Sequence, residues 1–176
     1  TLLRCLQWSQ AGRHRRVLEE VDRLLPETRD HPSLAAHLLI WKAQALLAMG
    51  CADRALPAAM HAWDLQSSPH ACHLMATAMA SLGEQERSEE LLEMGTRLFP
   101  EAVHLPVQLA MLMTDQGRLP EAFDILEDLP DGDGLPDDLQ VFVLGLKANL
   151  LAAMGRWWQA DDVLRTAVEL HPDSAL

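Results

Sequence analysis

The chain has 176 residues, of which 49% are hydrophobic and 23% charged, and it is long enough to bury a substantial core. Its formal net charge is −12, so we expect it to bind neither nucleic acid phosphates nor anionic lipid surfaces. No apolar run approaches the ~18 residues that span a bilayer, and membrane insertion is therefore not expected.

Taken in chain order, five glycines each separate two segments that have apolar residues at helical spacing. They are Gly12, Gly50, Gly83, Gly117 and Gly155, at intervals of 38, 33, 34 and 38 residues. The underlying period is about 34 residues, with insertions at PETRDHPS (26–33) and PDGDGLPDD (130–138). Glycine in a left-handed conformation ends a helix, and proline bars its continuation, so each glycine is predicted to join two helices.

The sequence therefore predicts five helix–turn–helix units. In chain order they cover approximately residues 1–30, 36–69, 70–102, 103–135 and 139–174. A lone helix pair cannot bury its apolar stripe, so we expect the units to stack into a single domain over 1–176. The first helix begins at residue 1 without an opening turn, and no polar helix follows HPDSAL. We therefore expect the domain to be part of a longer protein, with a further helix or repeat after it.

Small residues occupy two fixed places relative to the turn glycines. Seven residues before the glycine stand Cys5, Ala43, Ala76, Ala110 and Ala148. Five residues after it stand Ala55, Ser88, Ala122 and Ala160, whereas Val17 departs from the pattern. With the period, this pattern resembles the tetratricopeptide repeat (TPR) family over the whole chain. The resemblance implies an all-α fold, a right-handed superhelical α-solenoid of stacked antiparallel helix pairs.

The resemblance also implies that the first helices of successive units line a concave groove, the usual ligand site of the family. The candidate groove residues are His37, Ile40, Gln44, Leu47, His70, His73, Thr77, His104, Val107, Met111, Phe142 and Asn149. His37, His70 and His104 share one repeat position, which Phe142 continues. Such a row is either a contact surface that gains charge below about pH 6.5 or a set of solvated residues inherited from one ancestral repeat.

The best-known ligand of the family is the C-terminal acid of heat-shock chaperones, which is held by Lys and Arg beside Asn. Gln44 and Asn149 are present among the candidate groove residues, but no Lys or Arg accompanies them. We therefore do not expect binding of a chaperone tail.

The histidines also raise the question of a metal. In HACH (70–73), His70 and His73 lie one helical turn apart, but two nitrogens do not complete a zinc site, and the thiol of Cys72 points elsewhere. No metal and no cofactor are expected. The three cysteines lack CxxC spacing, so reduced thiols are expected, and a cytoplasmic location is favoured over secretion without the compartment being fixed.

Two short segments carry further expectations. In RWW (156–158), Trp157 stands where TPR turns often have an aromatic residue packed between helices, whereas Trp158 falls on a different helix face. In AGRHRR (11–16), the arginines precede Glu19, Glu20 and Asp22 and are expected to form helix ion pairs.

The sequence has no glycine-rich phosphate loop, no nucleophile elbow and no HExxH motif, so we expect no enzyme activity. The favoured function is a protein–protein interaction scaffold that binds a helix or peptide of mixed apolar and weakly basic character. One alternative is a targeting or substrate-recruiting module of a larger enzyme of the glycosyltransferase, sulfotransferase or hydroxylase type. The other is self-association through uncapped ends or Trp158.

Overall fold

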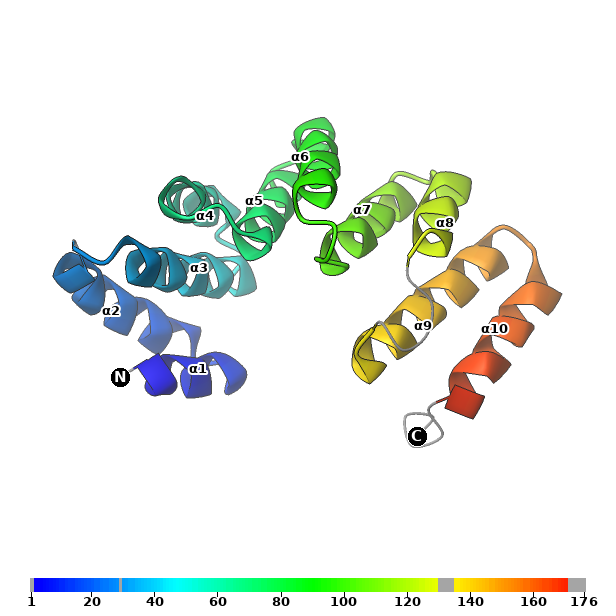
Figure 1. Cartoon of the computed structure of the whole chain (residues 1–176), viewed down its shortest axis with the longest axis horizontal. Coiled ribbons are helices and arrows are strands. Elements are labelled where there is room, and N and C mark those ends of the chain that lie inside the picture. Colours follow the sequence, from blue (N-terminus) through cyan, green and yellow to red (C-terminus); the bar gives the residue numbers. More distant parts are fainter. Residues whose placement is uncertain (1, 29, 130–134, 171–176) are drawn as a thin grey trace. The chain divides into compact units, whose positions relative to one another are not determined.

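The computed structural model describes residues 2–28, 30–129 and 135–170. In these ranges the chain forms ten α-helices and one short 3-10 helix (Figure 1). They are α1 (Leu2–Gln10), α2 (His14–Leu24), η1 (Leu25–Thr28), α3 (Pro32–Ala48), α4 (Ala52–Leu65), α5 (Pro69–Ser81), α6 (Gln85–Leu98), α7 (His104–Asp115), α8 (Leu119–Glu127), α9 (Asp137–Ala153) and α10 (Trp157–Leu170). The predicted all-α fold of stacked antiparallel helix pairs is confirmed. Most of the second expected insertion, residues 130–134, lies outside the described ranges.

Each of the five turn glycines has a positive φ, between 66° and 83°. At Gly83, the turn closes when the N–H of Glu84 donates to the carbonyl of Met79 over 2.9 Å and that of Gly83 donates to Ala80 over 3.0 Å. A Cβ on Gly83 would meet no atom within 4 Å, so the left-handed backbone, rather than a lack of space, favours glycine there. The repeated turn chemistry therefore sets the helix boundaries.

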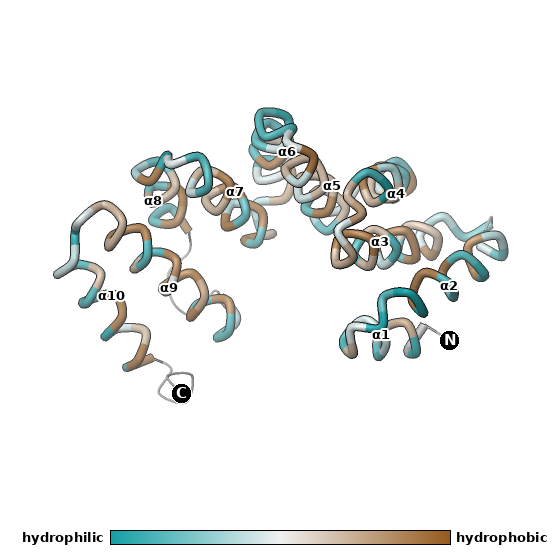
Figure 2. Tube along the Cα trace, turned by 180° about the vertical axis from the view of Figure 1, so that it is seen from behind, coloured by the Kyte–Doolittle hydropathy of each residue, from teal (hydrophilic) through white to brown (hydrophobic). Residues whose placement is uncertain are grey.

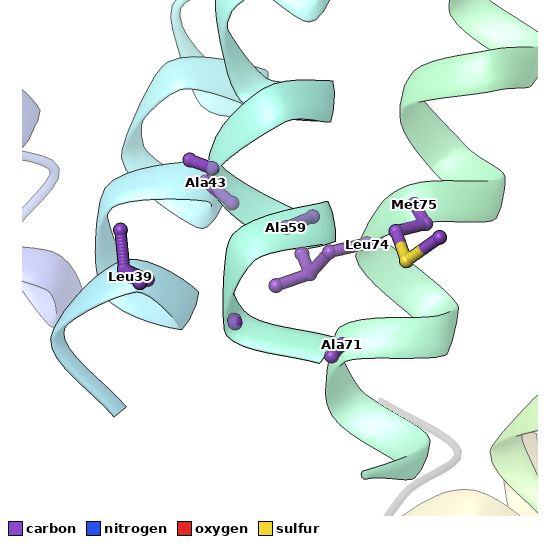
Figure 3. Close-up of a cluster of buried hydrophobic side chains, with 8 residues drawn as sticks. Leu39, Ala43, Ala59, Ala71, Leu74 and Met75 are labelled. Carbon is purple, nitrogen blue, oxygen red and sulfur yellow. The ribbon is translucent and has the colours of Figure 1, made fainter. Parts of the chain in front are cut away.

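The chain divides into two compact units, residues 1–102 and 103–176, and the boundary falls where the third expected repeat ends. Unit 1 contains α1 to α6, in which each helix packs on the next and α3 also packs on α5. One core cluster joins α3, α4 and α5, and Figure 3 shows Leu74 of α5 pointing toward Ala59 of α4. Unit 2 contains α7 to α10, and its fully buried leucines include Leu105, Leu126 and Leu150.

The small residues that carry the repeat pattern are all buried. Seven residues before the glycine, exposure is between 0% and 2% at Cys5, Ala43, Ala76, Ala110 and Ala148. Five residues after it, Val17, Ala55, Ser88, Ala122 and Ala160 are at most 6% exposed. Small side chains at both places let the two helices of a repeat approach closely where they cross. The departure at Val17 is therefore accommodated inside the core.

The last helix differs from the other second helices of the repeats. Leu164, nine residues after its turn glycine, is 49% exposed, whereas the equivalent Val21, Ala59, Leu92 and Leu126 are 0% exposed. The first helices α3, α5 and α9 pack on α2, α4 and α8, but among the described residues α10 packs chiefly on α9. The prediction that Trp157 packs between helices is wrong for the same reason, because Trp157 is 69% exposed. Trp158 is 75% exposed, as expected of a surface residue.

The arginines at the start of α2 also behave differently from the expectation. Glu20 binds Arg23 over 2.8 Å, and Asp22 binds Lys42 on α3 over 2.6 Å. Within the described ranges, no ion pair forms at Arg13, Arg15 or Arg16, and the prediction of helix ion pairs there is wrong. Glu20 and Asp22 have other partners, and the side chains of Arg13, Arg15 and Arg16 are exposed.

Candidate interaction surface

In unit 1, a hollow of about 350 Å³ lies where the start of α5 meets α3. Its walls combine five residues of α3 with three residues from the α4–α5 turn and the first turn of α5. They are Ala36, His37, Ile40, Trp41, Gln44, Gln66, Ser68 and His70. Four predicted groove residues, His37, Ile40, Gln44 and His70, are therefore brought together around one concavity.

Local sequence places both sides of this hollow. Pro32 begins α3 and Pro69 begins α5, in the first helical turn where proline costs no backbone hydrogen bond. Ser68 caps α5, because its hydroxyl accepts a hydrogen bond from the N–H of Ala71 over 3.2 Å. The cap holds the α4–α5 turn beside α3, and so His70 faces the same space as Gln44.

The hollow joins an apolar wall to an uncharged polar rim. Ile40 and Trp41 are half-buried, whereas Gln44 and His70 are exposed. His37 Nδ1 lies 2.7 Å from the carbonyl of Ser33. A carbonyl can only accept, so Nδ1 carries a proton and donates it to Ser33, which leaves Nε2 as the ring nitrogen not used within α3. Among the described residues, no lysine or arginine lines the hollow, and its chemistry suits an apolar side chain flanked by hydrogen-bonding groups.

The remaining predicted groove residues of unit 1 lie further along the two helices. Leu47 on α3 and both His73 and Thr77 on α5 are half-buried. The Thr77 hydroxyl donates to the carbonyl of His73 over 2.8 Å, so its proton is used within α5. Thr77 therefore does not offer its hydroxyl proton to a ligand.

Unit 2 carries the other predicted groove residues. Met111 is 43% exposed and Phe142 49% exposed, Asn149 is exposed, and His104 is half-buried at the start of α7. Val107 is only 4% exposed, and the expectation that its side chain is presented at the surface is wrong. It shares a helix face with Ala110, three residues later, which is completely buried. Of the predicted groove residues in this unit, Met111, Phe142 and Asn149 are therefore exposed at the surface.

His70 and His73 stand in the first turns of α5, on either side of Ala71 and Cys72. In the described part of the chain, no three His, Cys, Asp or Glu side chains are placed to hold a metal ion. The thiol of Cys72 points away from these histidines and toward α6, where it donates to the carbonyl of Leu91 over 3.5 Å. Burial raises the pKa of the Cys72 thiol to about 11, so it stays protonated and a poor metal ligand at neutral pH.

Within the described ranges, none of the helices combines the length and the apolar character needed to cross a bilayer.

Comparison with solved structures identifies the fold. A thermophilic TPR protein from Thermus thermophilus matches with a TM-score of 0.75 at 20% identity, covering 96% of this chain and 89% of that one. TPR-like repeats of a putative kinesin light chain from Podosopora anserina match with a TM-score of 0.73 at 17% identity, covering 97% and 92%. MamA from Desulfovibrio magneticus matches with a TM-score of 0.70 at 11% identity, covering 98% and 93%.

No protein-family model matches the chain, and no curated protein sequence does. The chain therefore has a TPR-like fold over nearly its whole length, with sequence identities that speak for the fold alone.

The sequence prediction missed part of the hollow. Trp41 stands on an apolar stretch and reads as a core residue, and Gln66 and Ser68 read as a turn. The available signal was the helix cap, because Ser68 followed by Pro69 marks the start of α5 beside the preceding first helix. The α4–α5 turn borders the hollow, so Gln66 and Ser68 are candidate binding residues as well.

Proposed function

We propose that the chain is a non-catalytic protein-interaction module, and that the surface formed by α3 and α5 binds a helix or an extended segment of a partner protein. The convergence of His37, Ile40, Gln44 and His70 on one hollow supports this proposal most directly. These residues occupy first-helix positions, where a TPR-like fold places its ligand.

The chemistry of the hollow defines the segment that fits it. Ile40 and Trp41 form an apolar wall against which an apolar side chain of the partner can pack. The amides and imidazoles on the rim can hydrogen-bond to the backbone of the same segment. A net charge of −12 favours weakly basic residues beside that anchor. The described lining lacks the Lys and Arg that would hold a terminal carboxylate, so a chaperone tail is not the proposed ligand.

The proposal is tested by affinity capture from a lysate of the source cells. The immobilised protein is compared with a Gln44→Lys, His70→Lys double variant, because an ammonium group on each side of the hollow would repel a weakly basic segment. His61→Lys on α4 is the control, since His61 is exposed and does not line the hollow. Circular dichroism first establishes that all three proteins are folded.

A protein that the unaltered chain and the His61 variant retain, and the double variant loses, would support the proposal and identify the partner. Equal retention by all three proteins would reject the α3–α5 surface as the binding site.

A second candidate function, self-association, is favoured by the exposed apolar side chains of α10. Trp157, Leu164 and Val168 recur at spacings of seven and four residues, so they lie on one helix face, and they are 69%, 49% and 52% exposed. Sedimentation velocity at two concentrations tests this candidate, and a monomer at both would remove it.

A further inference from the structure

The start of α2 forms a second hollow whose chemistry is opposite to that of the rest of the chain. It measures about 350 Å³ and is lined by Gly12, Arg13, His14, Arg15, Arg16 and Met49. Figure 2 shows the start of α2 as a strongly hydrophilic stretch. In a chain of net charge −12, three arginines around one concavity are a local concentration of positive charge that composition does not predict.

These three guanidinium groups are not used to hold the fold together. Two arginines close to other turns pair with nearby carboxylates, Arg87 with Glu84 and Arg118 with Glu121. Among the described residues, Arg13, Arg15 and Arg16 have no such partner. Their donor groups are therefore available to an external anion.

Placing arginines at this point is unfavourable for the helix itself. The first turns of α4, α6 and α8 contain Asp53, Glu86 and Glu121, which suit the positive end of a helix dipole. The first turn of α2 contains no acidic residue, and Arg13 at its N-cap makes no side-chain capping bond. Each misplaced charge costs about 0.3–1 kcal/mol in exposed helices. Basic residues in the first turn of a helix are unfavourable for folding, and such a departure without a compensating contact is typical of a functional site.

A buried polar atom in the same hollow also lacks a partner. His14 lines the hollow, and its Nδ1 is buried without a hydrogen bond to any described residue. Buried polar atoms in proteins are nearly always hydrogen-bonded, so the unsatisfied ring nitrogen is a second local cost at the start of α2, beside the misplaced arginines.

We propose that this hollow binds a phosphoryl group carried by a partner protein, a phosphorylated side chain in an otherwise uncharged segment. Guanidinium groups donate paired hydrogen bonds to phosphoryl oxygens, and a phosphorylated residue supplies a compact charge near −2. A nucleic acid or an anionic membrane would bring many charges toward a chain of net charge −12 and meet repulsion beyond the hollow. A single phosphoryl group is small enough to interact with the arginines alone.

This site goes beyond the proposed function, because it shares no lining residue with the hollow between α3 and α5. Its test uses the whole chain and isothermal titration with three probes: inorganic phosphate, a short uncharged peptide with one phosphoserine, and the same peptide with serine. The variants are Arg16→Glu and Arg54→Glu. Both residues are exposed and stand four residues after a turn glycine, so they form a matched pair.

The phosphoserine peptide should bind the unaltered chain, and the serine peptide should bind at least about tenfold more weakly, since the charge-assisted hydrogen bonds are lost. Arg16→Glu should weaken phosphopeptide binding about tenfold or more, whereas Arg54→Glu should change it by less than about twofold. Equal effects of the two substitutions, or equal binding of the two peptides, would overturn the proposal. Binding of inorganic phosphate without the phosphopeptide would overturn the assignment to a protein-borne group.

Thermal unfolding provides a second readout. Phosphopeptide should raise the unfolding temperature of the unaltered chain, and Arg16→Glu should lose that increase. A variant that keeps the full increase would contradict the proposal.

Discussion

Lys147 on α9 and Glu127 on α8 form an ion pair in unit 2, with 3.1 Å between Nζ and Oε1. Lys42 on α3 and Asp22 on α2 form the equivalent pair in unit 1. Both lysines stand eight residues before a turn glycine, and both acids stand ten residues after the preceding one. The two pairs bridge the junctions with the longer interval of 38 residues, whereas Met75, at the lysine position of the 33-residue junction, is 8% exposed.

This equivalence predicts how the α8–α9 junction responds to substitution. Lys147→Met should change the free energy of unfolding by less than about 1 kcal/mol, because a buried methionine replaces a nearly buried lysine of similar length, as Met75 does. Glu127→Gln should cost about 1 kcal/mol, since the ammonium of Lys147 loses its anionic partner while Glu127 itself is largely exposed. Urea denaturation measures both, and a larger loss for Lys147→Met would contradict the account.

Replacing glycine by alanine should change the free energy of unfolding in opposite directions at a turn and inside a helix. Gly117→Ala should destabilise unit 2 by about 1–2 kcal/mol, because φ is +78° and alanine strains a left-handed backbone. Gly145→Ala, in the interior of α9 with no atom within 4 Å of the new Cβ, should stabilise it by up to about 1 kcal/mol. Thermal unfolding followed by circular dichroism compares them, and two changes of the same sign would show that backbone conformation does not determine the cost.

The crossing of α5 and α6 should tolerate loss of a hydrogen bond better than added volume. Ser88 Oγ is buried and donates to the carbonyl of Ala76 over 2.9 Å. Ser88→Ala should cost about 1 kcal/mol, the net value of one such bond, since Ala55 fills the same repeat position. Ser88→Leu should cost about 1–3 kcal/mol or more through overpacking. Chemical denaturation of both variants checks the order, and a leucine variant as stable as the alanine variant would mean that the helices do not cross closely there.

The three cysteines should differ in reactivity. Burial raises the pKa of Cys72 to about 11 and also raises that of Cys5, whereas Cys51 is only half-buried. Since the thiolate is the reactive form, Cys51 should react first with a disulfide reagent at pH 8, and the other two only after unfolding. Mass spectrometry of the labelled peptides identifies the sites, and early labelling of Cys72 would contradict its burial.

The same shift has a consequence for stability at high pH. The pKa of Cys72 is higher in the folded chain than in the unfolded one, so between pH 9 and about 11 the unfolded state releases a proton that the folded state keeps. The contribution of Cys72 to stability is therefore complete below pH 9 and is lost as the pH rises. Cys72→Ala should flatten this part of the stability profile measured by urea denaturation, and an unchanged slope would contradict the assignment.

Much of the fold could be predicted from the sequence, because the repeat pattern depends on local chemistry. A glycine such as Gly50 marks a left-handed turn, and small residues such as Ala43 and Ala55 mark a close crossing, whatever surrounds them. These features act within one helix pair and repeat in register. The four groove residues that meet at the α3–α5 hollow follow from the same register.

The errors arose where exposure depends on what packs against a helix. Trp157 occupies a position that reads as core, but α10 leaves it exposed. Val107 occupies a groove position, yet it is covered. The arginines of α2 have carboxylates at suitable sequence spacing, but those of Glu20 and Asp22 are taken by Arg23 and Lys42. Competition between partners cannot be read from spacing alone.

Site-specific photocrosslinking tests directly whether the α3–α5 surface binds a partner protein. A photoreactive amino acid replaces Gln44, on the rim of the hollow, or His61, exposed on α4, and each protein is irradiated with the partner obtained by affinity capture. The account predicts a crosslinked product from position 44 and none from position 61, with the crosslinked partner peptide carrying an apolar residue. A product from position 61 alone would place the partner on the second helices and contradict the account.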